Sequence, residues 1–94
     1  MILIQCVRPA VGPIKTYVIK NKMLDLYKIG RTKDVYARIS NIQSMVPGGV
    51  ELIMVIDDDI ENALHKKFSK KKTNREWFAL TTADIKYIKS LMDK

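Results

Sequence analysis

Residues 15–38, which read KTYVIKNKMLDLYKIGRTKDVYAR, decide the fold of this chain. Apolar and polar side chains alternate in residues 16–20 and again in 26–30, and a polar, turn-prone segment separates them. Alternation with a period of two around a short connector predicts a β-hairpin. The second strand is followed by Thr32 and Asp34, and either side chain is able to cap a helix. We therefore expect two paired strands followed directly by a helix.

The rest of the chain predicts three helices and one further strand, and the short apolar run at residues 77–80 is an edge strand or a plug against the core. Val50–Ile56 is apolar nearly throughout, which suits a central strand covered on both faces. The first helix is expected over about 33–45, and the second begins at Asp58 or Asp59. A Thr-x-x-Asp capping pair at Thr81 predicts the start of the third. The apolar residues expected to face the core are Val35, Ile39 and Ile42, then Ile60, Leu64 and Phe68, then Ile85, Ile88, Leu91 and Met92.

These elements predict a single α+β domain over residues 1–94, with a small antiparallel sheet of about three strands flanked by helices. The apolar Met1–Val7 lacks the basic region and cleavage site of a signal peptide, so we expect an extra N-terminal strand there. Cys6 is the single cysteine, which excludes an internal disulfide and a cysteine-rich zinc site. No apolar run approaches ~18 residues, so no membrane span is expected. A cytoplasmic monomer is the default expectation.

The charge of the chain favours nucleic acid as a partner. Seventeen basic residues against ten acidic ones give a net charge of +7. Residues 66–75, KKFSKKKTNR, contain six basic residues and no acidic one. Such clustering is typical of a DNA-binding surface, although a solvated basic face that keeps a protein soluble is the plainer alternative. The candidate DNA-binding residues are Arg31, Lys33, Lys66, Lys67, Lys70, Lys71, Lys72 and Arg75.

Several short motifs, taken in order, resemble a known family. These residues are Thr16-Tyr17-Val18, Lys28-Ile29-Gly30, Arg38 and Glu61. The order resembles the GIY-YIG endonuclease superfamily, in which two motifs lie on neighbouring strands before a helix that bears an essential arginine. The sequences YKIGRT, ALHKKF and REWF are similar to the short phage-type branch, often labelled a DNA-binding domain. The resemblance covers residues 15 to about 88, most of the chain.

The resemblance implies a divalent-metal-dependent endonuclease that hydrolyses DNA phosphodiester bonds. It implies that Tyr17 helps to activate the attacking water and that Arg38 contacts the scissile phosphate. It places Glu61 as the ligand of one Mg²⁺ or another divalent cation. The tyrosine of the family's second motif falls on Lys28 here, and strand alternation places Lys28, rather than Tyr27, on the same face as Tyr17. We therefore expect the catalytic residues Tyr17, Lys28, Arg38 and Glu61 to line one shallow surface.

Each of these residues also has a plainer interpretation. Glu61 is the third helical residue of a capping box if Asp58 is the N-cap. Tyr17 suits an amphipathic strand, and Arg38 suits a stem that packs over apolar surface with a solvated head. His65 lies four residues after Glu61. Its functional interpretation is a second metal ligand or a proton shuttle, and its plainer interpretation is a hydrogen-bonded histidine beside the Trp77 region. Trp77 is expected to close the core rather than to stack on a base, and Asn74 is a weak candidate near the metal.

Two other functions remain open at this point. A DNA-binding module that has lost catalysis is favoured by the lysine in the second motif. It is also favoured by residues 40–43, which lack the histidine or tyrosine that often follows the family's arginine. A protein-interaction or inhibitor domain would need a net acidic or apolar surface, which the charge distribution does not favour.

Overall fold

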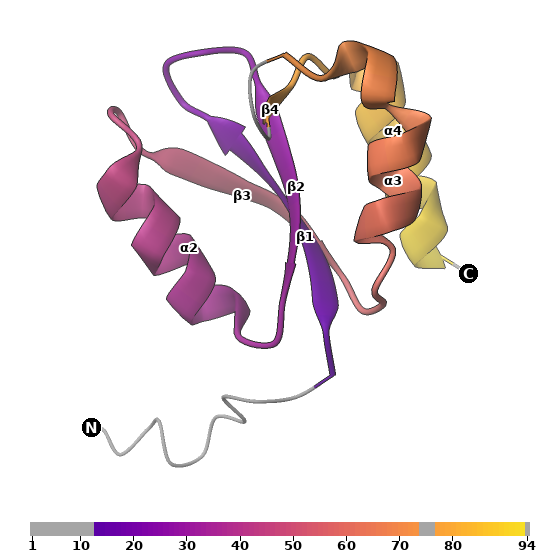
Figure 1. The fold of residues 1–94 in the computed structure, drawn as a ribbon, viewed down its shortest axis with the longest axis horizontal. Coiled ribbons are helices and arrows are strands. Elements are labelled where there is room, and N and C mark those ends of the chain that lie inside the picture. The colour runs from indigo at the N-terminus through magenta and orange to yellow at the C-terminus, as the bar shows by residue number, and fades with distance from the viewer. Residues whose placement is uncertain (1–12, 74–76, 94) are drawn as a thin grey trace.

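The computed structural model describes residues 13–73 and 77–93. They form an α+β domain with a four-stranded antiparallel sheet, in the order β3-β1-β2-β4. Helix α2 covers one face of the sheet, and α3 and α4 cover the other (Figure 1). The elements are β1 (Lys15–Asn21), β2 (Tyr27–Thr32), α2 (Val35–Met45), β3 (Val50–Ile56), α3 (Glu61–Lys67), the 3-10 turn η1 (Ser69–Lys71), β4 (Trp77–Phe78), α4 (Thr82–Ser90) and the 3-10 turn η2 (Leu91–Asp93).

The predicted hairpin is present, and it forms the centre of the sheet. Strands β1 and β2 pair antiparallel, with Val18 opposite Ile29 and Tyr17 opposite Gly30. The side chain of Asn21 accepts hydrogen bonds from the backbone N–H groups of the next loop residues, Met23 and Leu24. An asparagine that bonds to its own following backbone holds the chain in a turn, which fits the turn-prone composition of this segment.

Strand β1 is buried on both faces, so the sheet has two separate apolar cores. Toward α2, Tyr17 and Ile19 pack with Ile42 and Val50. Toward α3 and α4, Val18 packs in a larger cluster. The remaining buried members of that cluster are Ile29, Met54, Ile56, Leu64, Phe68, Phe78, Leu80 and Ile88. The stripes predicted for the three helices supply most of the helical contacts, whereas Met92 is exposed.

The prediction that Val50–Ile56 is the central strand is wrong. This strand, β3, lies at the edge of the sheet formed by the described residues, and Leu52 is 42% exposed. Val18 pairs with Met54 while Ile19 pairs with Leu52, so Ile53 is the extra residue of a β-bulge. The bulge turns Val50 toward one core and Met54 toward the other. The apolar run is continuous because the bulge changes which face of the sheet the side chains point to, and not because both faces of β3 are covered.

Two further points concern the number of strands, and the first is that the edge strand considered for residues 77–80 is present. Trp77 and Phe78 form β4 on β2, so the sheet has four strands rather than about three. Trp77 packs on the α2-side core, as expected for a residue that closes it. The strand predicted at Met1–Val7, together with Cys6, lies outside the described residues.

The second helix begins later than predicted, for a tertiary reason. The buried hydroxyl of Thr16 on β1 accepts a hydrogen bond from Ile60 N at 2.9 Å and donates one to Asp58 O at 2.7 Å. These two bonds hold residues 58–60 outside the helix, so α3 starts at Glu61 with Ile60 as N-cap. The carboxylate of Asp58 accepts from Asp59 N at 2.8 Å, and no side chain caps α3 by a hydrogen bond, so the capping box proposed for Asp58 and Glu61 is wrong.

The starts of α2 and α4 agree with the sequence. Asp34 caps α2 by accepting from Ala37 N at 3.2 Å. Thr81 and Asp84 form a complete capping box at α4, and Lys71 of η1 makes an ion pair with Asp84. Burial alone would raise the pKa of the Asp84 carboxyl, but hydrogen bonds from Lys71 and Thr81 outweigh it and lower that pKa.

The Thr16 hydroxyl should contribute measurably to stability. Thr16→Val keeps the shape but leaves Ile60 N–H and Asp58 C=O without their buried partner, so we expect a loss of about 1–3 kcal/mol in the free energy of unfolding. Thr16→Ser keeps the hydroxyl and should lose less. Urea denaturation followed by circular dichroism measures both, and equal losses would show that the missing methyl, not the hydroxyl, matters.

The Asp84 carboxylate should make stability depend on pH in a defined direction. Because the folded state lowers its pKa, its contribution is full above the unfolded pKa of about 3.9 and is lost as pH falls through the lower folded value. The stability difference between the wild type and Asp84→Asn should therefore shrink on acidification. Asp25→Asn, at an exposed ion pair with Lys20, serves as the control and should differ little from wild type. A pH-independent Asp84 difference contradicts the prediction.

Candidate active site and nucleic-acid interface

Tyr17 and Gly30 form the centre of the α2-side half of the candidate site. They are direct partners across β1 and β2, and Tyr17 is 2% exposed. A Cβ atom at Gly30 would lie 2.4 Å from the Tyr17 hydroxyl oxygen. The tyrosine ring therefore crosses onto β2 only because residue 30 has no side chain, which is the close approach that a strand glycine permits.

Lys28 lies on the same face of the sheet as Tyr17. It is opposite Ile19 on β1, which packs in the α2-side core, and opposite Trp77 on β4. Tyr27 packs against the core on the other face. The prediction that alternation places Lys28, not Tyr27, beside Tyr17 is thus confirmed by the register.

Arg38 lies on α2, which packs on this same face, and it is exposed. The helix contacts β3 through one flank, since Gln43 accepts from Val50 N at 2.5 Å and Tyr36 lines a cavity with Leu52. A helix turns about 100° per residue, so Arg38 projects from roughly the opposite flank. Because β3 is the edge strand of the described sheet, a flank of α2 that points away from β3 points in the direction of β1 and β2.

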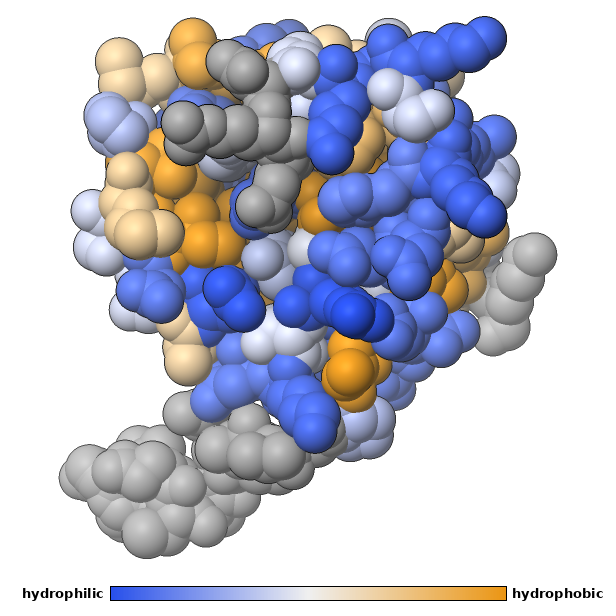
Figure 2. All heavy atoms as spheres, in the orientation of Figure 1, coloured by the Kyte–Doolittle hydropathy of each residue, from blue (hydrophilic) through white to orange (hydrophobic). Residues whose placement is uncertain are grey.

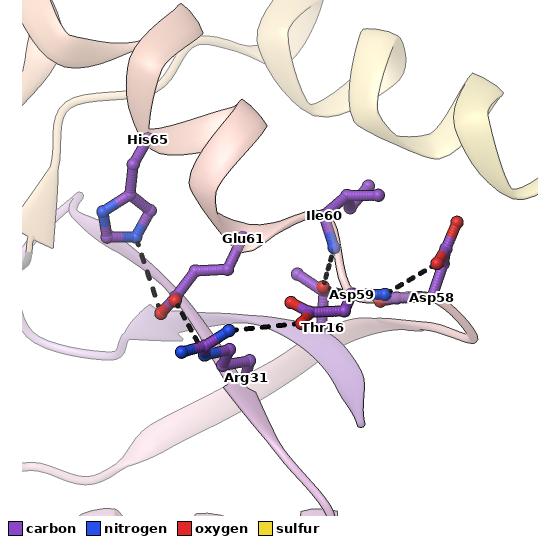
Figure 3. Close-up of polar contacts among 7 residues, drawn as sticks. All are labelled: Thr16, Arg31, Asp58, Asp59, Ile60, Glu61 and His65. Carbon is purple, nitrogen blue, oxygen red and sulfur yellow. Dashed lines mark hydrogen bonds and ion pairs between the residues drawn. The ribbon is translucent and has the colours of Figure 1, made fainter. Parts of the chain in front are cut away.

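Glu61 lies across the sheet from these three residues. It opens α3, which packs on the other face, and its carboxylate is 3.4 Å from Nε of Arg31 and 3.9 Å from Nε2 of His65 (Figure 3). Arg31 also donates from Nη1 to Asp59 Oδ2 at 3.2 Å. The expectation that Tyr17, Lys28, Arg38 and Glu61 line one surface therefore fails at Glu61. Alternation explains the separation, because Thr16 and Arg31 face α3 while Tyr17 and Gly30 face α2.

Both halves of the site border one stretch of backbone. Among the described residues, 29–32 of β2 pair with β1 alone, because β4 reaches only Tyr27 and Lys28. We call residues 29–32 the unpaired edge of β2, where unpaired means that they form no strand pairing with a described residue outside β1. Tyr17 and Lys28 lie on its α2 side, and Arg31 and Glu61 lie on its α3 side. Thr16 and Asp59 were not predicted to belong to the site. Strand alternation alone places Arg31 on the face of the sheet opposite to that of Lys28.

His65 is a structural residue in this arrangement. Its Nε2 lies 2.8 Å from Ile29 O, where a protonated Nε2 donates a hydrogen bond, and its ring stands edge-on to Phe78 with centroids 5.0 Å apart. This agrees with the interpretation as a hydrogen-bonded histidine near the Trp77 region. The contact also fixes α3 to the unpaired edge of β2.

Some of the basic residues interact with a carboxylate or an aromatic ring of the fold, and others form no ion pair with a described residue. Lys71 pairs with Asp84, and Nζ of Lys67 lies 4.3 Å above the Tyr87 ring. By contrast, an exposed set forms no ion pair with the described residues: Lys33, Arg38, Lys66, Lys70 and Lys72. Hydrophilic side chains cover the surface over α3 (Figure 2). Arg75 and Asn74 lie outside the described residues.

A metal ion would find one carboxylate at Glu61 rather than a preformed cage. In residues 13–73 and 77–93, no group of three His, Cys, Asp or Glu side chains is placed to hold a metal. The Glu61 side chain is 21% exposed, and it contacts Arg31 by an ion pair. Mg²⁺ is commonly held by one or two carboxylates with water completing the shell, so Glu61 fits a site of this kind.

One comparison with known proteins identifies a family. The family model of the T5orf172 domain matches residues 15–93, which includes every described element. No curated protein and no solved structure matches the chain. Within the described part of the chain, no helix is long and apolar enough to cross a membrane. The chain belongs to the T5orf172 domain family, a nuclease-related family that indicates DNA as the partner.

Proposed function

We propose that the chain binds DNA through backbone phosphates along the unpaired edge of β2 and hydrolyses a phosphodiester bond there with a divalent cation held by Glu61. One observation carries this proposal. Residue types suited to phosphoryl chemistry gather on both faces of the sheet at the unpaired edge of β2. Tyr17 and Lys28 lie on the α2 face, and Arg31 and Glu61 lie on the α3 face. A strand of DNA that crosses this edge would contact both sides.

The residues have separable roles in this proposal. The planar fork of Arg38 matches phosphate oxygens and would stabilise the charge that develops on the scissile group. Lys28 supplies positive charge on the face of Tyr17, whose phenolate would orient the attacking water and accept its proton. A cation bound at Glu61 would neutralise charge on the phosphate. This assignment also rests on the resemblance of the two strand motifs to GIY-YIG endonucleases.

The exposed lysines would position the DNA without reading its sequence. Phosphate contacts fix register and orientation but carry no sequence information directly. Lys66, Lys70 and Lys72 are exposed after or at the end of the helix that presents Glu61, and none pairs with a described carboxylate. A cluster of this kind suits phosphates that flank the scissile bond.

A second candidate is a DNA-binding module that does not cleave. It is favoured by the burial of Tyr17 and Gly30 and by the ion pair that already occupies Glu61. For both candidates the net charge of +7 indicates DNA as the partner. An inhibitor domain would instead need a net acidic or apolar surface of its own. Cleavage and binding therefore have to be measured separately.

We expect Glu61→Gln to abolish Mg²⁺-dependent nicking of supercoiled plasmid while DNA affinity changes by no more than a few-fold. The substitution removes the cation ligand and keeps the side-chain shape. Glu51→Gln, at an exposed carboxylate on the edge strand β3, is the matched control and should cleave like wild type. No cleavage by any of these proteins would leave the binding module as the function. Cleavage by Glu61→Gln at the wild-type rate would show that Glu61 is not the ligand of the cation.

Arg38→Ala should slow cleavage by about 10²–10³-fold, the usual cost of one lost transition-state charge contact. Lys89→Ala, at an exposed lysine on α4, is the control and should change the rate little. Single-turnover rates on a labelled duplex separate this effect from binding. An equal, small loss in both variants would mean that Arg38 acts only through long-range charge.

The exposed lysines should determine how affinity depends on salt. We expect Lys70→Ala with Lys72→Ala to lower the slope of log affinity against log salt by about 1.8, since each phosphate contact contributes about 0.9 on duplex DNA. Lys71 is left in place because it holds Asp84. The control removes the same charge at Lys86 and Lys89 of α4, and fluorescence anisotropy measures all three proteins. Identical slopes for the two double variants would show that net charge alone is acting.

A further inference from the structure

Arg31 occupies the carboxylate that the proposed cation would need. Its guanidinium is 3.4 Å from Glu61 through Nε and 3.2 Å from Asp59 through Nη1, so one fixed positive charge neutralises two carboxylates (Figure 3). A guanidinium stays charged at every physiological pH. A divalent cation that approaches Glu61 must therefore compete with a resident cation.

The ion pair between Arg31 and Glu61 is partly exposed, so a competing anion is able to break it. The Arg31 side chain is 47% exposed, and its contact with Glu61 is an ion pair. Exposed ion pairs are weak, so a competing anion would displace the guanidinium. A DNA phosphate is such an anion, and Arg binds it with two parallel hydrogen bonds.

Glu61 would keep its place after Arg31 leaves. Its neighbour His65 is fixed by the contact with Ile29 O at 2.8 Å and does not depend on Arg31. The helix start that carries Glu61 is fixed by Thr16 through Ile60 N. The carboxylate would thus be released without loss of the backbone that positions it.

We propose that Arg31 is a latch on Glu61: the guanidinium neutralises the carboxylate in the free protein, and a DNA phosphate draws it away so that Glu61 accepts the divalent cation. This inference rests on the proposed function, because it takes Glu61 as the cation ligand. Two consequences follow. The free protein binds the cation weakly, and DNA and cation strengthen each other's binding by the same factor, as linkage requires.

The experiment measures Mn²⁺ binding to the full chain by the electron paramagnetic resonance signal of free Mn²⁺. Without DNA, Arg31→Gln should bind Mn²⁺ about tenfold more tightly than wild type, which corresponds to about 1.4 kcal/mol. Arg31→Lys, which keeps a charge, should gain less. Lys89→Gln removes an exposed cation on α4 and should match wild type. The gain must disappear in Arg31→Gln with Glu61→Gln.

A second arm adds a short duplex, with Mn²⁺ bound by the DNA itself subtracted through the Arg31→Gln, Glu61→Gln double variant. The duplex should tighten Mn²⁺ binding to wild type and add little in Arg31→Gln. Circular dichroism verifies that each variant is folded. Wild-type Mn²⁺ affinity in Arg31→Gln, or a gain that survives Glu61→Gln, overturns the latch.

The latch and the proposed function fail in different ways. If Arg31→Gln gains Mn²⁺ affinity through Glu61 but no protein cuts plasmid, the latch stands and cleavage falls. If cleavage needs Glu61 but Arg31→Gln binds Mn²⁺ like wild type, cleavage stands and the latch falls.

Discussion

The alternation of neighbouring side chains on β1 is the constraint on which the whole arrangement depends. Thr16 and Tyr17 are adjacent, so they must face opposite sides of a strand that is buried on both. Tyr17 reaches over Gly30 and defines the α2 side of the unpaired edge. Thr16 bonds to the loop before α3 and so places Glu61 beside Arg31. One dipeptide thus positions both halves of the candidate site.

This constraint makes residue 30 special for a reason of space. A methyl group there would collide with the Tyr17 ring, which is held by the α2-side core and has little freedom to move. Overpacking of this kind typically costs about 1–3 kcal/mol. Gly30 therefore permits the Tyr17 ring to cross onto β2, and neither residue is explained alone.

The hairpin, the helix stripes and two of the caps were predictable from sequence, because each depends on local periodicity or on a side chain within three residues. Three features were not. The bulge at Ile53, the late start of α3 and the pairing of Arg31 with Glu61 depend on contacts between residues distant in sequence. The strand parity that placed Lys28 correctly also predicts Arg31 on the opposite face. The sequence did not indicate that α3 packs on the face of the sheet that carries Arg31.

The basic residues that the structure describes fall into two groups. Lys71 and Arg31 neutralise carboxylates within the fold, whereas Lys70, Lys72 and Arg38 pair with no described carboxylate. Charge alone does not distinguish these groups, since both lie in the same short segments of sequence. The distinction decides which substitutions test stability and which test DNA binding.

The most direct measurement is amide chemical-shift mapping of Glu61→Gln, which should bind without cutting, during titration with a short duplex. If DNA crosses the unpaired edge of β2, the largest shifts should fall on Gly30, Arg31 and Thr32, on the start of α3, and around Arg38. Amides of the β3 edge, such as Glu51 and Leu52, should move little. Large shifts on β3 or α4 with a silent β2 would contradict a site that spans this edge.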